Sequence, residues 1–127
     1  MSDFDLLNER KEAILASLDF NPPAEYINFI LSNDIIYNNQ HYSYLSECGD
    51  YLYAVNEVIT ANSECHADEF YPGYFLIGSN GGGEAYAIEK ASARLIMTPF
   101  IGHDEETPIL IGRTWPEFLK HLRDNDD

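Results

Sequence analysis

The fold of this chain is decided by residues 74–89, which read Tyr74-Phe75-Leu76-Ile77-Gly78-Ser79-Asn80-Gly81-Gly82-Gly83-Glu84-Ala85-Tyr86-Ala87-Ile88-Glu89. Two apolar runs flank a glycine cluster, and the second run alternates large residues with alanines, as a β-strand does. A phosphate-binding loop would need a lysine and a hydroxyl residue where Glu84 and Ala85 stand, and a carboxylate there would repel a polyphosphate. We therefore predict a glycine-linked β-hairpin. The glycines expected to serve its backbone geometry are Gly78, Gly81, Gly82 and Gly83.

Helices are predicted on both sides of this hairpin. A first helix follows from the helical spacing of apolar residues, namely Phe4, Leu7, Ile14, Leu15 and Leu18. A second helix is expected to start at a cap on Asn21 and to end near residues 32–34. Asn56 is expected to cap a third helix and Thr114 a last one, whose buried face is Trp115, Phe118, Leu119 and Leu122.

Strands are predicted around the hairpin at residues 51–55 and 95–98, with a further short strand near residues 42–45. Residues 102–108 have the glycine, proline and charge content of a loop. Helices at both ends of a set of strands with short turns predict one α+β domain over residues 1–127, with its core at about 4–123. Its sheet is expected to be mainly antiparallel, flanked by N-terminal, middle and C-terminal helices.

The charge of the chain limits its partners. Seven basic and 22 acidic residues give a formal net charge of −15, which disfavours direct binding to nucleic acid or to an anionic membrane. A basic partner is favoured instead, although an acidic surface can also simply keep a protein soluble and monomeric. The first residues are charged where a signal peptide would be apolar, so a cytoplasmic protein is expected. Cys48 and Cys65 are then expected to be thiols with a packing role.

The chemistry of enzymes finds little support in the sequence. Adjacency of Cys65 and His66 does not supply the spatial geometry of a catalytic pair, and no nucleophile elbow is present. Acidic stretches with a histidine occur at residues 66–69 and 103–106, but neither has the spacing of a zinc or calcium site, so a solvated acidic surface is the simpler interpretation. We expect no catalytic residues, no metal and no cofactor. The nine tyrosines are more informative, because tyrosine is enriched at protein interfaces.

Four segments in this order resemble the SUKH superfamily, which includes yeast cell-wall synthesis regulators and many bacterial immunity proteins that neutralise toxins. Residues 22–30 resemble its early helix, and residues 53–62 resemble its strand and following helix with an early Glu and a later Asn. Residues 75–89 look like its Ile-Gly-x-x-Gly-Gly-Gly hairpin, and residues 114–119 resemble its closing helix. The resemblance covers about residues 22–122.

The resemblance implies a non-enzymatic immunity protein that neutralises a toxin, and the acidic charge suggests that the toxin is a basic nuclease domain. Acidic residues would steer the partner, and exposed tyrosines would supply contact area. The residues expected to bind it are Tyr44, Asp50, Glu57, Asp68, Glu69, Tyr71, Asp104, Glu105 and Glu106. Further candidates of the same kinds are Tyr37, Tyr42, Tyr51 and Glu64. The alternative is a regulatory adaptor that recruits an endogenous partner, as in the cell-wall branch, whereas a small-ligand protein would need a polar pocket near the glycine hairpin.

Overall fold

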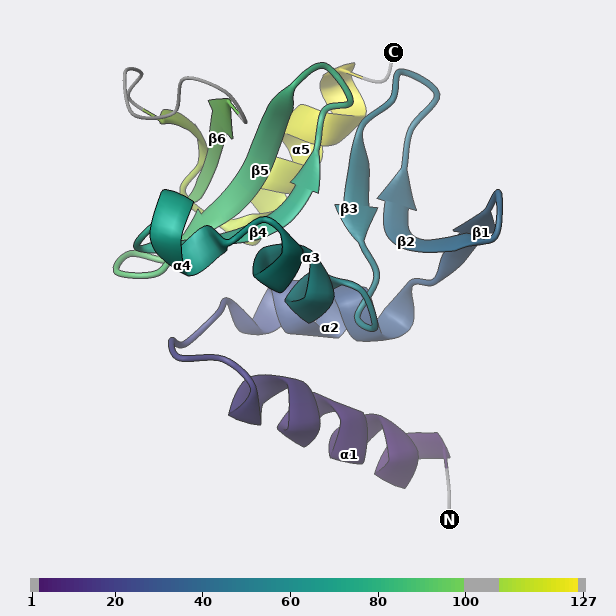
Figure 1. Ribbon diagram of the computed structural model, residues 1–127. Coiled ribbons are helices and arrows are strands. Elements are labelled where there is room, and N and C mark those ends of the chain that lie inside the picture. Colours follow the sequence, from purple (N-terminus) through teal and green to yellow (C-terminus); the bar gives the residue numbers. More distant parts are fainter. Residues whose placement is uncertain (1–2, 100–107, 126–127) are drawn as a thin grey trace.

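The computed structural model describes residues 3–99 and 108–125 of the chain. Its helices are α1 (Asp3–Ala16), α2 (Ala24–Ser32), α3 (Val58–Glu64), α4 (Ala67–Phe70) and α5 (Trp115–Asn125). Its strands are β1 (Ile35–Tyr37), β2 (Gln40–Leu45), β3 (Tyr51–Tyr53), β4 (Tyr74–Ser79), β5 (Glu84–Glu89), β6 (Leu95–Pro99) and β7 (Ile109–Gly112). The strands form one sheet in chain order, and every neighbouring pair is antiparallel (Figure 1). The predicted α+β class, with helices before, within and after the strands, is confirmed.

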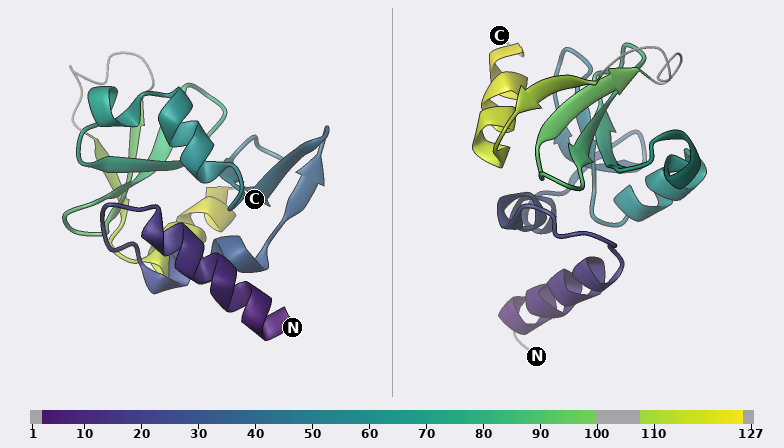
Figure 2. Two further views of the ribbon diagram at one scale, coloured as in Figure 1. Left: turned by 60° about the horizontal axis from the view of Figure 1, so that its bottom comes forward. Right: turned by 90° about the vertical axis from the view of Figure 1, so that its left-hand side faces the viewer.

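The central strands of the sheet are covered on both faces. Tyr86 and Ile88 of β5 belong to a core cluster with residues of α2 and α5, whereas Ala85 and Ala87 belong to a second cluster with residues of α4. The alternation seen in the sequence therefore separates two packing layers, as successive strand residues point to opposite faces. Figure 2 shows the sheet between α5 on one side and α3 with α4 on the other.

Side chains of the β4–β5 turn accept hydrogen bonds from the backbone N–H groups of the same turn. Ser79 Oγ accepts a hydrogen bond from the amide of Gly81 at 3.0 Å. Asn80 Oδ1 accepts from the amides of Gly82 at 2.8 Å and Glu84 at 3.2 Å. These amides are the donors that a bound phosphate would need. Because side chains of the turn already occupy them, the glycine cluster is a structural turn and offers little to an anion.

Two of the four hairpin glycines are required by close approach of the backbone. A Cβ on Gly78 would overlap the carbonyl oxygen of Tyr51 and lie 2.9 Å from Leu52 Cα, because β3 lies close beside β4 where Leu52 pairs with Gly78. Gly81 has a φ of +73°, and a Cβ on it would lie 2.8 Å from the carbonyl oxygen of Gly49. Gly82 has neither constraint, since its nearest neighbour would be Asn80 Oδ1 at 3.5 Å. Gly82 was predicted to serve the backbone geometry of the hairpin together with the other three glycines, but the structure shows no requirement for glycine at this position.

The last helix forms as its sequence predicts. Thr114 Oγ1 lies 3.4 Å from the amide of Glu117, and Glu117 Oε2 accepts from the amide of Arg113 at 2.8 Å, so both groups satisfy amides at the helix start. Phe118 is fully buried and its ring lies 5.3 Å from that of Tyr86 on β5. Trp115 packs edge-on against Tyr26 of α2 at 5.1 Å. The helix is thus fixed to the sheet and to α2 together.

Two predicted helix starts are wrong for local reasons. α2 begins at Ala24, its N-cap is Pro23 in an extended conformation, and no side chain caps it. The residue before a proline avoids the helical region, so Pro23 keeps Pro22 from being the first helical residue. Asn21 therefore lies too far before Ala24 to cap the helix. α3 has Glu57 rather than Asn56 at its N-cap, because the amides of Glu57 and Val58 both bond to the carbonyl of Ala54 in a preceding turn.

Other differences concern the ends of elements. In α1, Ile14 is buried but Leu15 is 39% exposed, so the predicted apolar stripe is only partly correct, and the side chains of Phe4 and Leu7 lie outside the described part. The third helix does not continue past Glu64, because His66 has a left-handed φ of 52° that separates α3 from α4. Strand β1 was not predicted.

Candidate protein-binding groove

A groove of about 440 Å³ lies between the first strands of the sheet and α3. Its lining comes from the β1–β2 turn, β2, β3 and one side of α3. These residues are Asn39, Gln40, His41, Tyr42, Tyr51, Tyr53, Glu57, Thr60, Ala61 and Glu64. We call this site the tyrosine groove. The strands and the helix α3 that carry its lining residues can be followed in Figure 1.

Three tyrosines form the sheet side of the groove. Tyr42 of β2 is paired with Tyr53 of β3, and Tyr51 lies two residues from Tyr53, so all three side chains share one face of the sheet. The ring centroids of Tyr42 and Tyr51 are 5.6 Å apart, and those of Tyr51 and Tyr53 are 5.8 Å apart, both edge-on. Such contacts orient the rings relative to one another, so the aromatic wall is ordered before any partner arrives.

One face of α3 forms the opposite wall. Glu57, Thr60, Ala61 and Glu64 follow the spacing i, i+3, i+4, i+7, which places them on one side of the helix. The two small residues lie between Glu57 and Glu64, whose Cα atoms are separated by roughly 10 Å along the helix axis. Within residues 3–99 and 108–125 the ion pairs are His41–Asp34 and Lys90–Asp19, so neither glutamate has a cationic partner there.

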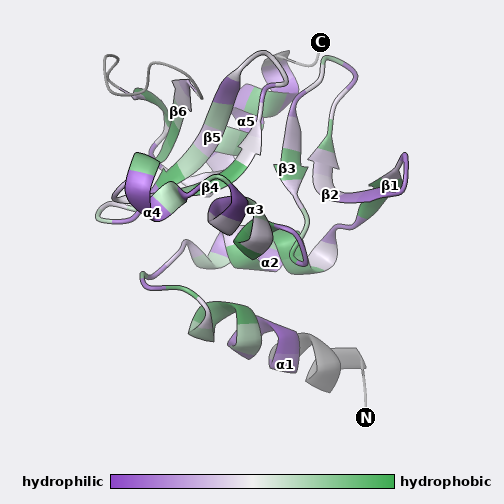
Figure 3. Ribbon diagram, in the orientation of Figure 1, coloured by the Kyte–Doolittle hydropathy of each residue, from purple (hydrophilic) through white to green (hydrophobic). Residues whose placement is uncertain are grey.

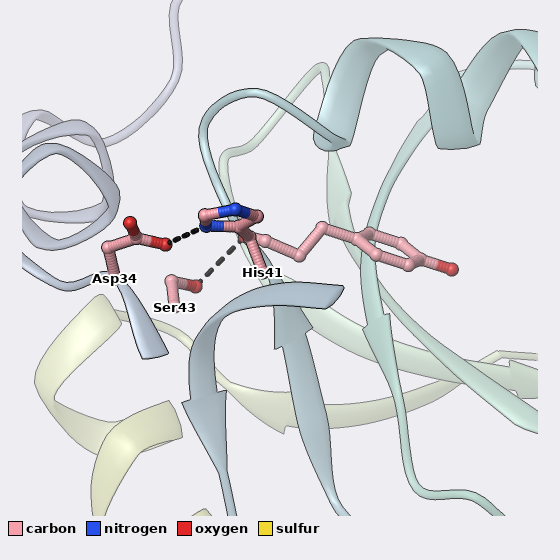
Figure 4. A network of polar contacts seen from close by, with 4 residues as sticks. Asp34, His41 and Ser43 are labelled. Atoms are coloured by element: carbon pink, nitrogen blue, oxygen red, sulfur yellow. Dashed lines mark hydrogen bonds and ion pairs between the residues drawn. The ribbon is translucent and has the colours of Figure 1, made fainter. Parts of the chain in front are cut away.

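Polar contacts fix the rim of the groove at the β1–β2 hairpin. His41 Nδ1 lies 2.8 Å from a carboxylate oxygen of Asp34, which stands between α2 and β1 (Figure 4). Ser43 Oγ donates to the backbone oxygen of Tyr53 at 2.9 Å, and the Tyr42 hydroxyl donates to Gln40 Oε1 at 3.0 Å. The hairpin is therefore tied to α2 and to β3, and the groove wall is preformed.

The groove combines neutral aromatic rings with negative charge. A tyrosine phenol is already protonated at neutral pH, and burial, with a smaller effect of neighbouring Tyr51, raises the pKa of Tyr53 further. Among the described residues, no lysine or arginine lines the groove. A cation that enters would meet π-faces on one side and carboxylates on the other, an arrangement that favours a basic group.

Exposed apolar residues continue this surface onto β1. Ile35 is 40% exposed and Tyr37 is 58% exposed, and β1 forms one edge of the sheet. Figure 3 shows apolar residues within β1 at this edge. Ile35 is paired with Tyr42 and Tyr37 with Gln40, so both share the face of the sheet on which the groove tyrosines lie. An exposed apolar edge beside an ordered groove is typical of a surface that contacts another protein.

Two of the residues expected to bind a partner are buried, and that expectation of exposure is wrong. Asp50 is 6% exposed, and its carboxylate accepts a hydrogen bond from the Tyr86 hydroxyl at 2.9 Å, so it satisfies a polar group of the core. Tyr71 is also 6% exposed and packs in the cluster of α4 with Leu76. Tyr44 is half-buried against the main core.

The remaining candidates are distributed over two places. Glu57 and the further candidates Tyr42, Tyr51 and Glu64 meet in the tyrosine groove. Asp68 and Glu69 are exposed and line a second groove of about 580 Å³ between the end of α1, α3, α4 and β4. This second groove also holds the ion pair of Lys90 and Asp19, whose closest atoms are 3.0 Å apart.

The acidic loop residues Asp104, Glu105 and Glu106 lie outside the described residues. The sequence reasoning missed Tyr53 as a groove residue. The signal was present in the spacing of Tyr51 and Tyr53, because strand residues two apart share a face.

The described residues give no support to a reactive thiol at Cys65 or to a metal site. Burial, with a smaller effect of Glu64, raises the pKa of the Cys65 thiol, which lowers its thiolate fraction and hence its reactivity. Across the described ranges, no group of three or more His, Cys, Asp or Glu side chains is placed to hold a metal ion. Among the same residues, no helix has both the length and the apolar character that crossing a membrane requires.

Comparison with known proteins identifies the family. A search of curated proteins found no match to the chain. The family model for SMI1 / KNR4 (SUKH-1) matches residues 9–121, which include every strand of the sheet and most of α5. This chain is therefore a member of the SMI1 / KNR4 family, SUKH-1, as its sequence resemblance predicted.

Proposed function

We propose that this chain is a non-enzymatic immunity protein that acts in the bacterial cytoplasm and neutralises a basic toxin domain, most simply a nuclease. The family to which it belongs covers immunity proteins and cell-wall regulators, and its members bind protein partners. Occlusion is the mechanism: the acidic protein covers the positive surface with which a nuclease holds phosphates.

The tyrosine groove is the observation that carries this proposal. Aromatic side chains give large, rigid contact area and are enriched at the centre of protein interfaces. Here they face Glu57 and Glu64, which have no cationic partner among the described residues, in a chain with a net charge of −15. Such a surface is complementary to a basic protein and is poorly suited to a nucleic acid or an anionic membrane.

The acidic residues have two different tasks in this proposal. Glu57 and Glu64 would contact the partner in the groove, while Asp68 and Glu69, together with Asp104, Glu105 and Glu106, would attract it over longer distances. Long-range attraction raises the association rate and is screened by salt, whereas desolvated contacts lower the dissociation rate.

Co-expression with the product of the neighbouring gene tests the proposal. A cell that carries this gene product alone should stop growing, and growth should return when the chain is expressed with it. The purified pair should associate faster at low salt than at high salt. If the neighbouring product is harmless, or if it is toxic and is neither bound nor neutralised, the immunity role is wrong. Binding to a harmless endogenous protein would instead favour the adaptor role.

A further inference from the structure

We propose that the tyrosine groove is a subsite for arginine, in which the guanidinium of a basic protein partner stacks on the aromatic wall and pairs with a carboxylate of α3. This inference rests on the proposed function for the identity of the partner, but its chemistry can be tested without it. It names the anchor residue that the groove selects.

The aromatic wall suits a planar cation. The rings of Tyr42, Tyr51 and Tyr53 form a continuous edge-on series with centroid spacings of 5.6 and 5.8 Å. Guanidinium is planar and weakly hydrated, so it stacks on such rings at little desolvation cost. The ammonium of lysine is compact and strongly hydrated, and it gains less from the same rings.

The opposite wall supplies the negative charge. Glu57 and Glu64 lie at the two ends of one face of α3, and Thr60 and Ala61 leave the space between them open. A guanidinium that enters over Ala61 can reach a carboxylate with two parallel N–H···O bonds, which an ammonium cannot match in geometry. The groove thus offers both halves of an arginine site. Among the described residues that line it, the one basic side chain is His41, which already lies against Asp34.

The second groove is a useful comparison, because it is acidic but lacks the aromatic wall of the tyrosine groove. It also has two exposed carboxylates, Asp68 and Glu69, but Lys90 supplies an internal cation that pairs with Asp19. The residues that line it include no edge-on series of tyrosines comparable to that in the tyrosine groove. The matched double variants Glu57→Gln with Glu64→Gln and Asp68→Asn with Glu69→Gln therefore remove equal charge from two different environments.

The test is an NMR titration of the full chain with N-acetyl-arginine methylamide and with N-acetyl-lysine methylamide at low ionic strength. We expect the arginine probe to shift the amides of residues 51–53 and 57–64 and to bind at least about fivefold more tightly than the lysine probe. The Glu57→Gln and Glu64→Gln pair should weaken arginine binding at least about tenfold, and the Asp68→Asn and Glu69→Gln pair less than about twofold.

Two single variants test the other features of the site: Tyr53→Leu tests stacking of the guanidinium on the aromatic wall, and Ala61→Leu tests whether the probes enter the groove. Tyr53→Leu should remove most of the preference for arginine over lysine, and Ala61→Leu should block both probes by filling the groove. Spectra of the free variants show whether each one keeps the fold. If Ala61→Leu does not fold, Thr60→Leu fills the same wall from an exposed position and should likewise block both probes. Equal binding of the two probes, or shifts spread equally over both grooves, would overturn the arginine assignment.

A protein-borne arginine and a free guanidine are distinguished by a third titration, with an arginine-containing peptide from the basic surface of the neighbouring gene product. Tighter binding of that peptide than of the isolated probe supports a protein partner, and tighter binding of the isolated probe contradicts it. The two proposals fail separately. A chain that neutralises its toxin without arginine preference disproves this inference alone, and a chain that prefers arginine but neutralises nothing disproves only the immunity role.

Discussion

The central hairpin and the tyrosine groove both depend on aromatic residues, but they use them in opposite ways. In the hairpin region, Tyr86 is 2% exposed, its hydroxyl is bonded to Asp50, and its ring packs on Phe118. In the groove, the tyrosines form a wall of an open hollow whose facing carboxylates have no cationic partner in the described part of the chain. The aromatic residue of the hairpin region has its packing and hydrogen-bond partners within the molecule. The groove carboxylates have no cationic partner among the described residues.

This difference separates stability from binding. Substitutions in the hairpin region should lower the free energy of unfolding, because they leave cavities, overlaps or unpaired polar groups behind. Charge-removing substitutions in the groove should leave stability almost unchanged and affect only a partner. The comparison would fail if the groove proved to be as important for folding as the hairpin.

The largest effect is expected for Phe118→Ala. The side chain is fully buried between α5 and β5, so its removal should cost about 3–5 kcal/mol of unfolding free energy. Lys120→Ala, on the exposed side of the same helix, is the control and should be nearly neutral. Chemical denaturation measures both, and an unchanged midpoint for Phe118→Ala would show that α5 is peripheral.

Gly78→Ala comes next. Its new Cβ would overlap the Tyr51 carbonyl oxygen, and backbone cannot give way as a flexible side chain does, so we expect a loss on the order of 3 kcal/mol. Gly82→Ala is the matched control in the same hairpin, because a Cβ there meets only ordinary contacts. Thermal unfolding of the two variants decides the point, and equal melting temperatures would mean that β3 does not approach β4 as described.

Asn62→Ala should remove the link between α3 and β4. Asn62 Nδ2 donates a hydrogen bond to the backbone carbonyl of Leu76, and Asn62 Oδ1 accepts one from the backbone N–H of Leu76, both at 2.8 Å. Leu76 is fully buried. Leaving two buried backbone groups unpaired should cost about 2–3 kcal/mol. Asn33→Ala breaks one partly buried bond to Phe29 and should cost less than about 1 kcal/mol. Urea denaturation of both variants provides the test, and similar losses for the two would contradict it.

The smallest stability effect concerns two buried hydroxyls. Tyr86→Phe leaves the buried Asp50 without its phenol partner and should cost about 1–2 kcal/mol. The Tyr26 hydroxyl is buried with no hydrogen-bond partner among the described residues, so Tyr26→Phe should be neutral or slightly stabilising. Calorimetry of the pair gives the sign for each, and a loss at Tyr26 as large as that at Tyr86 would reveal a missing partner.

The sequence predicts the central hairpin and its packing better than it predicts the tyrosine groove. Alternation of Tyr86 and Ile88 with alanines, and the helical spacing of Trp115, Phe118 and Leu122, identify both packing layers because burial imposes a period on the chain. Asp50 was misassigned for the opposite reason. A buried acid that bonds to Tyr86, 36 residues away in the chain, looks like any surface acid until the fold brings the two together.

Several residues of the groove were predicted to bind a partner, but the sequence did not predict that these residues lie together in one groove. Tyr42, Tyr51, Glu57 and Glu64 were identified as candidates, but their meeting depends on the register of β2 with β3 and on the placement of α3. Both are tertiary features that no local pattern encodes. Strand β1 was missed because three residues give too short a period to recognise.

The central claim is that the groove, and not acidity in general, holds the partner. Its most direct test is the dissociation rate of the complex with the basic neighbouring gene product for two variants of equal charge. Both Glu57→Gln with Glu64→Gln and Asp68→Asn with Glu69→Gln should slow association, because each removes two negative charges. Only the groove pair should also hasten dissociation, by at least about tenfold. Equal dissociation rates for the two variants would contradict the account.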